Sequence, residues 1–146
     1  MIKTIYIPGV PDSKMRPRAT KNGHMYDPNA AKKEASIQKA QVTGYKGVFK
    51  GALRVNFDFV FPRPKSHYRT GKNAGTLRPD APEYCCNSKD FDNLEKFYCD
   101  SFNFIHYVDD RQIVAASTFK TWAEFEKTPH VKMTIKALEP EKEEAE

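Results

Sequence analysis

The sequence has few cysteines and no long hydrophobic run, and both absences exclude whole classes of protein. Only three cysteines occur among the 146 residues. Their number is odd and Cys85 and Cys86 are adjacent, which argues against a disulfide framework and a structural zinc site, because zinc ligands need characteristic spacing. No run approaches the roughly 20 apolar residues that cross a bilayer, and the N-terminus lacks the apolar core of a signal peptide. We therefore expect a cytoplasmic protein with no membrane partner.

Acidic residues are scarce in the first part of the chain. Residues 1–80 carry 16 lysines and arginines against 5 acids, whereas residues 81–146 carry 8 against 14, so the net charge of +5 conceals halves of opposite sign. A basic half can be a merely solvated surface, but basic residues that accompany a cluster of acids favour a phosphate-rich partner. From charge alone we expect that partner to be nucleic acid.

Hydrophobic alternation and turn signals predict one small α/β (α+β) domain over residues 1–138. The hydrophobic content of 39% is enough for a core. The predicted elements are strands at 3–7, 53–61, 113–121 and 130–138, and helices at 30–41 and 92–102, with Gly44 ending the first helix. We expect a mixed sheet of about four strands that packs against the two helices. The tail, residues 139–146, is nearly all Glu, Lys and Pro and is predicted to be disordered.

Residues 62–89, which we call the arm, have a composition that argues against regular structure. Loops of this length inside a small domain are usually functional or mobile. The arm contains five cations, Arg63, Lys65, Arg69, Lys72 and Arg78, interleaved with His67, Tyr68 and Tyr84. A mobile arm of this kind can bind phosphates and stack on bases. A merely solvated loop is the alternative.

The most distinctive segment is DFDNLEKFYCDSFNFIHYVDDRQIV, residues 90–114. Asp90 and Asp92 are two residues apart, so on an extended segment they share one face and can converge on one point. Carboxylate oxygens suit Mg²⁺ or Mn²⁺, which leave further positions to water and substrate phosphate. Asp109 or Asp110, at the entry to the next strand, can complete such a site.

Lys96 lies one helical turn beyond Asp92, on the same face. There it can neutralise charge in a transition state or position the attacking water. Each residue also has a structural alternative: Asp92 as a helix N-cap, Lys96 as its i+4 partner, and Asp109-Asp110 as a turn signal. We interpret Asp100, two turns past Asp92, as structural or as a residue that supports the metal ligands, and His106 as structural rather than as a catalytic aid. Together the residues narrowly favour a metal-dependent phosphodiester enzyme.

The order of these residues resembles a known family. Asp90-Phe91-Asp92-Asn93-Leu94-Glu95-Lys96, followed by Asp109-Asp110-Arg111-Gln112, resembles the DxDNLxK and DD-x-Q signature of the RusA family of Holliday junction resolvases. Pro8-Gly9 with Arg16-Pro17-Arg18 is similar to its opening, and Pro62-Arg63-Pro64-Lys65-Ser66 to its basic segment. The resemblance runs from about Ile5 to Trp122. Two departures are Ser88-Lys89-Asp90, where the family usually has Lys-Pro-Asp, and Asn103-Phe104, where relatives often have Asn-Gly.

The resemblance implies a RusA-like endonuclease, bacterial or phage-encoded, that acts in recombination, replication or repair. It implies a homodimer that cuts DNA four-way junctions symmetrically with Mg²⁺, for which Mn²⁺ can substitute, and that uses no small organic cofactor. The implied catalytic residues are Asp90, Asp92, Lys96 and Asp110; the three carboxylates would hold the metal, with Asp109 as a further candidate. The expected DNA-binding residues are Lys14, Arg16 and Arg18, and in the arm Arg63, Lys65, Arg69, Lys72 and Arg78. The alternatives are a non-catalytic branched-DNA-binding protein and a less selective flap or single-strand nuclease.

Overall fold

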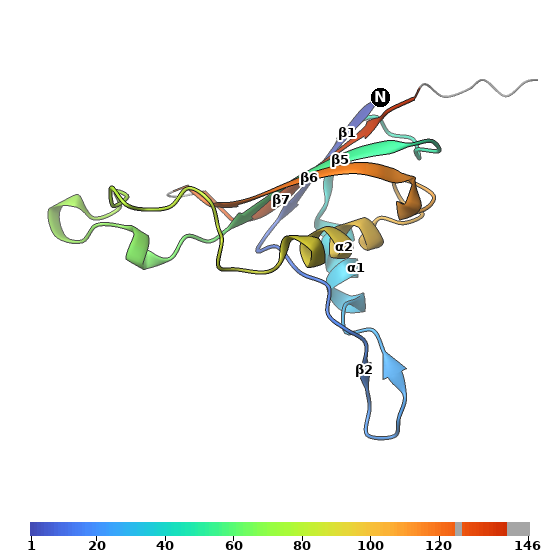
Figure 1. Ribbon diagram of the computed structural model, residues 1–146, viewed down its shortest axis with the longest axis horizontal. Helices are drawn as coiled ribbons and strands as arrows, with labels where there is room; N and C mark the ends of the chain where they lie inside the picture. Colours follow the sequence, from blue (N-terminus) through green and yellow to red (C-terminus); the bar gives the residue numbers. More distant parts are fainter. Residues whose placement is uncertain (125–126, 140–146) are drawn as a thin grey trace, which may run out of the picture.

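Five strands form one mixed sheet, and both helices lie on the same face of it (Figure 1). The computed structural model describes residues 1–124 and 127–139. The elements of the domain are β1 (Ile2–Pro8), α1 (Ala30–Lys39), β4 (Gln41–Gly44), β5 (Leu53–Phe61), α2 (Phe91–Ser101), β6 (Ile113–Trp122) and β7 (His130–Ala137), with a small separate hairpin of β2 (Arg18–Ala19) and β3 (Met25–Tyr26). The strand order is β4-β1-β7-β5-β6. The predicted fold class is confirmed.

The centre of the sheet follows directly from the alternation in β5. Its odd-numbered residues from Leu53 to Phe61 are buried, whereas Arg54, Asn56 and Asp58 are exposed. The buried side chains form the core with β7 and with one face of α2, whose contributions are Val131, Met133, Ile135, Leu94, Phe97 and Tyr98. Each large apolar side chain that is fully buried stabilises the fold by roughly 1.5–3 kcal/mol. The alternation therefore fixes which face of the sheet receives the helices.

The parallel pairing of β5 with β6 determines where α2 lies. All other neighbours in the sheet are antiparallel. A parallel pair needs a long crossover connection, and here residues 62–112 supply it, including the arm and α2. The Glu95 carboxylate on α2 accepts a hydrogen bond from the Thr118 hydroxyl on β6. The crossover helix is thereby tied to the edge strand of the sheet.

The predicted end of the first helix and the predicted role of Gly44 were wrong. The first helix ends at Lys39 rather than at residue 41, and Gln41–Gly44 forms β4. Because β4 pairs with β1, the sheet has five strands, where about four were predicted. The β-branched side chains of this segment favour a strand, and Gly44, with φ of +89°, ends the strand instead of the helix. The β2–β3 hairpin was not predicted. The other predicted strands agree with the structure to within one residue.

The arm has more local structure than its composition predicts. It contains two 3₁₀ turns, Lys65–His67 and Gly71–Asn73, and a β-bridge between Tyr68 and Leu77. Both of its ends are held against the end of β6: Ala123 N donates to Phe61 O (2.7 Å) and Cys85 N donates to Lys120 O (2.8 Å). In Figure 1 the arm and the β2–β3 hairpin project from the domain in different directions. Mobility of the arm stays a prediction.

Two further predictions concern the tail and the membrane. Of the tail that was predicted to be disordered, residues 140–146 lie outside the described residues. Within the ranges that the structure describes, no helix is long and apolar enough to cross a membrane.

Candidate active site

The N-terminal end of α2 presents three exposed charged side chains. Asp90 occupies the N-cap position, one residue before the helix, but its carboxylate makes no capping hydrogen bond. Asp92 and Lys96 follow on the exposed side of the helix. In the described part of the chain, none of these three residues enters an ion pair. The structural alternatives for Asp92 and Lys96 are therefore wrong, because Asp92 is not the cap and Lys96 does not pair with it.

Residues 9–17, which we call the N-terminal loop, lie along α2 and are held there by three hydrogen bonds. Lys14 N donates to Asn93 O (3.0 Å), and Asp12 N donates to the Tyr98 hydroxyl oxygen (2.9 Å). Lys89 Nζ donates to Pro11 O at 2.6 Å. Lys89 stands where the family usually has proline, so this departure from the family pattern gains a contact that fixes the N-terminal loop.

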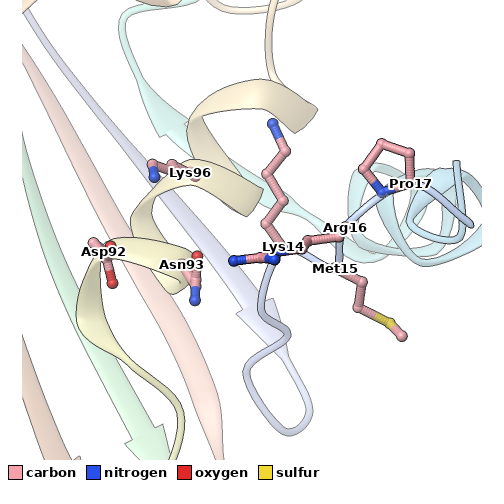
Figure 2. Close-up of a pocket in the computed structure, with 7 residues that line it drawn as sticks. All are labelled: Lys14, Met15, Arg16, Pro17, Asp92, Asn93 and Lys96. Carbon is pink, nitrogen blue, oxygen red and sulfur yellow. The ribbon is translucent and has the colours of Figure 1, made fainter.

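A pocket of about 530 Å³ lies between the N-terminal loop and α2 (Figure 2). Its lining residues are Lys14, Met15, Arg16 and Pro17 from the loop and Asp92, Asn93 and Lys96 from the helix. In Figure 2 the Arg16 side chain extends toward Asn93, whereas Lys14 points along α2 toward its C-terminal end. The structure therefore brings together Arg16, Asp92 and Lys96, two cations and one carboxylate around a space that accommodates a phosphodiester.

Asp100 has a structural role, as its position predicted. Its carboxylate accepts from Lys14 Nζ at 3.0 Å and from Lys33 Nζ at 3.4 Å, and Lys33 also pairs with Asp27 at 3.5 Å. Burial raises the pKa of Asp100, but the two lysines outweigh burial, so the pKa lies below its ordinary value. The cluster joins the N-terminal loop, α1 and α2. Lys14, a predicted DNA-binding residue, is thus engaged within the protein.

Asp109 and Asp110 lie side by side but have different environments. Asp109 caps the short 3₁₀ helix Asp110–Gln112: its carboxylate accepts from Arg111 N (2.9 Å), which lowers the pKa of Asp109, and Gln112 completes a capping box. Asp109 therefore has the structural role that was given as the alternative, a turn signal before the strand. The pKa of Asp110 is raised by burial and by the charges of Asp109 and Asp100, although a hydrogen bond with Asn103 opposes this. Asp109 forms an ion pair with Arg111, whereas Asp110 forms none with a described residue.

The oxygen atoms around Asp110 fit a hard divalent cation. Asn103 Oδ1 is buried without a hydrogen-bond partner, which is uncommon for a buried amide oxygen. A cation next to Asp110 and Asn103 would satisfy that oxygen and offset the repulsion between the neighbouring carboxylates. Sequence reasoning missed Asn103, because an asparagine before a turn is common for structural reasons alone.

The structure does not gather the predicted metal carboxylates at one point. Among the residues with described positions, no group of three or more His, Cys, Asp or Glu side chains lies close enough to hold a metal. Asp90 and Asp92 lie at the start of α2, whereas Asp110 lies near Asp100 beside its end. At about 1.5 Å per residue, Asp92 and Asp100 are separated by roughly 12 Å along the helix. The two sets of oxygen ligands are therefore separate in this chain.

The remaining predicted DNA-binding residues lie on the two projections. Arg18 is exposed on the β2–β3 hairpin, and Lys65, Arg69, Lys72 and Arg78 are exposed on the arm. Arg63 is half-buried at the base of the arm, where its guanidinium donates to Pro82 O at 2.8 Å. In Figure 1, α2 lies between the two projections. The cations are thus spread over a wide surface with the carboxylates near its middle.

Exposed carboxylates beside a basic pocket, in an α+β domain with two basic projections, are features that suit a nucleic-acid-cleaving enzyme. The comparison with protein families makes the assignment specific. The model of the family described as Endodeoxyribonuclease RusA matches residues 8–136, so the chain belongs to the RusA family and is an endodeoxyribonuclease. The match includes both segments that carry the resemblance, residues 90–96 and 109–113. A search of the curated proteins gives no match.

Proposed function

We propose that this endodeoxyribonuclease is Mg²⁺-dependent and resolves four-way DNA junctions by symmetric phosphodiester hydrolysis. The observation that carries the proposal is the pocket in which Asp92 and Lys96, which form no ion pair with any described residue, lie with Arg16. The helix dipole favours Asp92 in the first turn of α2, but Asp92 and Lys96 are exposed and contribute little to packing. A bound cation would pair with the Asp92 carboxylate, and a bound phosphate would pair with the Lys96 ammonium.

Each residue of the site has a distinct part in the proposed reaction. Asp90 and Asp92 would hold Mg²⁺ beside the pocket, whereas Asp110 with Asn103 would offer a separate pair of oxygen ligands for a divalent cation near the other end of α2. The chemistry that Mg²⁺ would supply there is activation of a water molecule and stabilisation of negative charge on the phosphate. Arg16 binds and orients the scissile phosphate through its guanidinium. The Lys96 ammonium stabilises the charge that develops on the leaving oxygen. Without a cation, the negative charge of Asp92 repels the phosphate.

The two basic projections support a branched substrate. Phosphate contacts position a protein on DNA without reading its sequence. The arm and the hairpin, which carry basic side chains, extend away from the domain in different directions, and α2 lies between them (Figure 1). The pocket is lined in part by α2. A straight duplex follows one direction, whereas a junction presents arms to both projections at once. The proposed preference for junctions rests on this divergence.

Symmetric cleavage needs two active sites, which we propose are supplied by a homodimer. β6 is an edge strand of the sheet, and it exposes Val114 (65%) and Phe119 (54%). The turn that precedes it exposes Phe104 (80%). Large exposed apolar side chains near one sheet edge suit an interface with a second copy. Light scattering should give twice the chain mass, and Val114→Glu should give the monomer; a wild-type monomer at micromolar concentration would contradict the dimer.

The activity is tested with a labelled synthetic four-way junction and a linear duplex of the same sequence, with and without Mg²⁺. We expect paired symmetric nicks on the junction that require Mg²⁺. Asp92→Asn should abolish cleavage while junction binding persists or tightens, because a negative charge near the phosphate is removed. Asp58→Asn, which changes an exposed aspartate of β5, is the matched control and should cleave like the wild type. Binding without cleavage in Mg²⁺ or Mn²⁺ contradicts catalysis, and equal cleavage of the duplex contradicts junction selectivity.

A further inference from the structure

Lys3 is a buried lysine that forms no ion pair with a carboxylate of the described residues. Its side chain lies on the core-facing side of β1 and the residue is only 2% exposed. Its Nζ donates to Gly47 O at 2.7 Å, lies 3.1 Å from His106 Nδ1, and is positioned over the rings of Tyr45 and Phe49 at 5.8 and 5.4 Å from their centroids. It enters none of the ion pairs between described residues. A carbonyl, an imidazole and two rings therefore stabilise this ammonium group.

The contact with His106 fixes the state of the imidazole. An ammonium group has only donors, so Nδ1 must accept and the ring proton lies on Nε2. Burial and the neighbouring Lys3 charge lower the pKa of His106 to about 4, which keeps the ring neutral at physiological pH. The ring also packs against Phe102 with centroids 5.0 Å apart. His106 is thereby held in one orientation.

His106 lies within residues 102–108, the turn that connects α2 to Asp109 and Asp110. Within the turn, His106 N donates to Phe102 O (3.1 Å), and Phe49 N donates to His106 O (2.9 Å). At the far end of the turn, the Gln112 side chain accepts from Asp109 N (2.9 Å) and donates to Phe49 O (3.0 Å). The turn is thus joined to the chain around Phe49 at two points, and Lys3 joins it to β1.

The turn needs such support because its backbone is strained. Phe104 has φ of +66°, the left-handed region that costs a residue other than glycine about 1–2 kcal/mol. Strained conformations persist where the surrounding structure holds them, and they concentrate at functional sites. A buried methionine would fill the space of the Lys3 stem without the cost of burying a charge. Methionine would give no directional bond to the imidazole, and that bond is what lysine adds.

We propose that Lys3 and His106 are positioning residues, whose hydrogen bond sets the place of Asp110 beside Asn103 in the active site. The inference rests on the proposed function of Asp110. Neither side chain touches the substrate. Their effect reaches the carboxylate through the backbone from His106 to Asp110, four positions later, so a loss of the bond would displace the oxygen ligands that Asp110 and Asn103 offer to a divalent cation. A displacement of about 1 Å at a reacting centre can cost up to a hundredfold in rate.

The test compares His106→Leu and Lys3→Met, which remove the bond, with His106→Gln, whose amide oxygen can still accept from Lys3. Lys136→Met removes an exposed lysine of β7 and is the matched control. At a temperature where circular dichroism shows every variant folded, we expect His106→Leu and Lys3→Met each to lower kcat for junction cleavage about tenfold, with KM within about twofold. The double variant should be no slower than either single one. His106→Gln should recover most of the rate.

A second readout does not depend on cleavage. Mn²⁺ affinity of the DNA-free protein, measured by electron paramagnetic resonance, should fall about fivefold or more in His106→Leu and be retained in His106→Gln and Lys136→Met. Folded variants with wild-type kcat and Mn²⁺ affinity, or a double variant with additive losses, overturn the proposal. If the wild type cuts no DNA, the proposed function is wrong. The Mn²⁺ affinities still show whether the bond between Lys3 and His106 positions Asp110. If Lys3→Met does not fold, the two His106 variants decide it alone.

Discussion

Replacing Phe104 by glycine should stabilise the protein, although it removes an aromatic side chain. The residue has φ of +66° and is 80% exposed, so its ring contributes little packing while its backbone carries strain. Relief of the left-handed conformation gains about 1–2 kcal/mol. The greater freedom of glycine in the unfolded chain takes back about 0.4–1 kcal/mol. We expect a net increase of about 0.5–1 kcal/mol in the free energy of unfolding.

The corresponding change in melting temperature is measurable. At about 2.1 cal/mol/K per residue, the unfolding entropy of this chain is about 0.3 kcal/mol/K, so Tm should rise by about 2–3 °C. Differential scanning calorimetry at pH 7 measures it, with Phe104→Ala as the control that removes the ring and keeps the strain. Because Phe104 also lies on the proposed dimer surface, the scans are run at several protein concentrations. Phe104→Gly melting no higher than Phe104→Ala at every concentration would refute the reasoning.

Three further predictions concern the active site and the DNA surface. Burial and neighbouring acids raise the pKa of Asp110, so its ionised form destabilises the fold, and Asp110→Asn should raise Tm at pH 7. This gain in Tm should vanish as the pH falls through the pKa of the wild-type carboxyl. A gain in Tm that grows in acid would contradict the prediction. Gln112→Ala removes bonds to both Asp109 and the chain at Phe49, so urea unfolding should show a loss of about 2 kcal/mol, and no loss would show that these bonds contribute little. Lys72→Ala should reduce the slope of log Kd against log salt for junction binding by about 1 while kcat at saturating DNA stays constant; an unchanged slope would place Lys72 off the DNA.

The sequence predicts an element well where burial is one-sided. β5 was recognised because alternate residues from Leu53 to Phe61 are apolar, and the structure buries those residues on one face. β4 was missed because all four of its residues are exposed, so no hydrophobic period marks it, and the β2–β3 hairpin is exposed throughout in the same way. Such strands form through their pairing partners, and the partner of β4 lies more than thirty residues earlier, in β1.

The sequence indicates candidate site residues more fully than it indicates their arrangement. Local spacing placed Asp92 and Lys96 on one helix face, which the structure shows. The separation of Asp110 from Asp92 depends on how the turn after α2 folds back, and no local pattern contains that information. A signal for Lys3 did exist, since the period of two that buries Ile5 and Ile7 in β1 buries residue 3 as well.

Because both ends of the arm are held at the same end of β6, the arm can tolerate changes in its length and sequence. Phe61 and Cys85 are bonded to neighbouring positions at one end of β6, so the segment between them leaves the domain and returns to it at almost the same place. Loop length adds to closure cost only slowly, at about 0.6 kcal/mol for each doubling. The arm therefore behaves as an exchangeable part: it can be shortened, lengthened or replaced by that of a relative without disturbing the sheet. The sheet and α2 can therefore stay unchanged while the arm is varied, by evolution or by engineering.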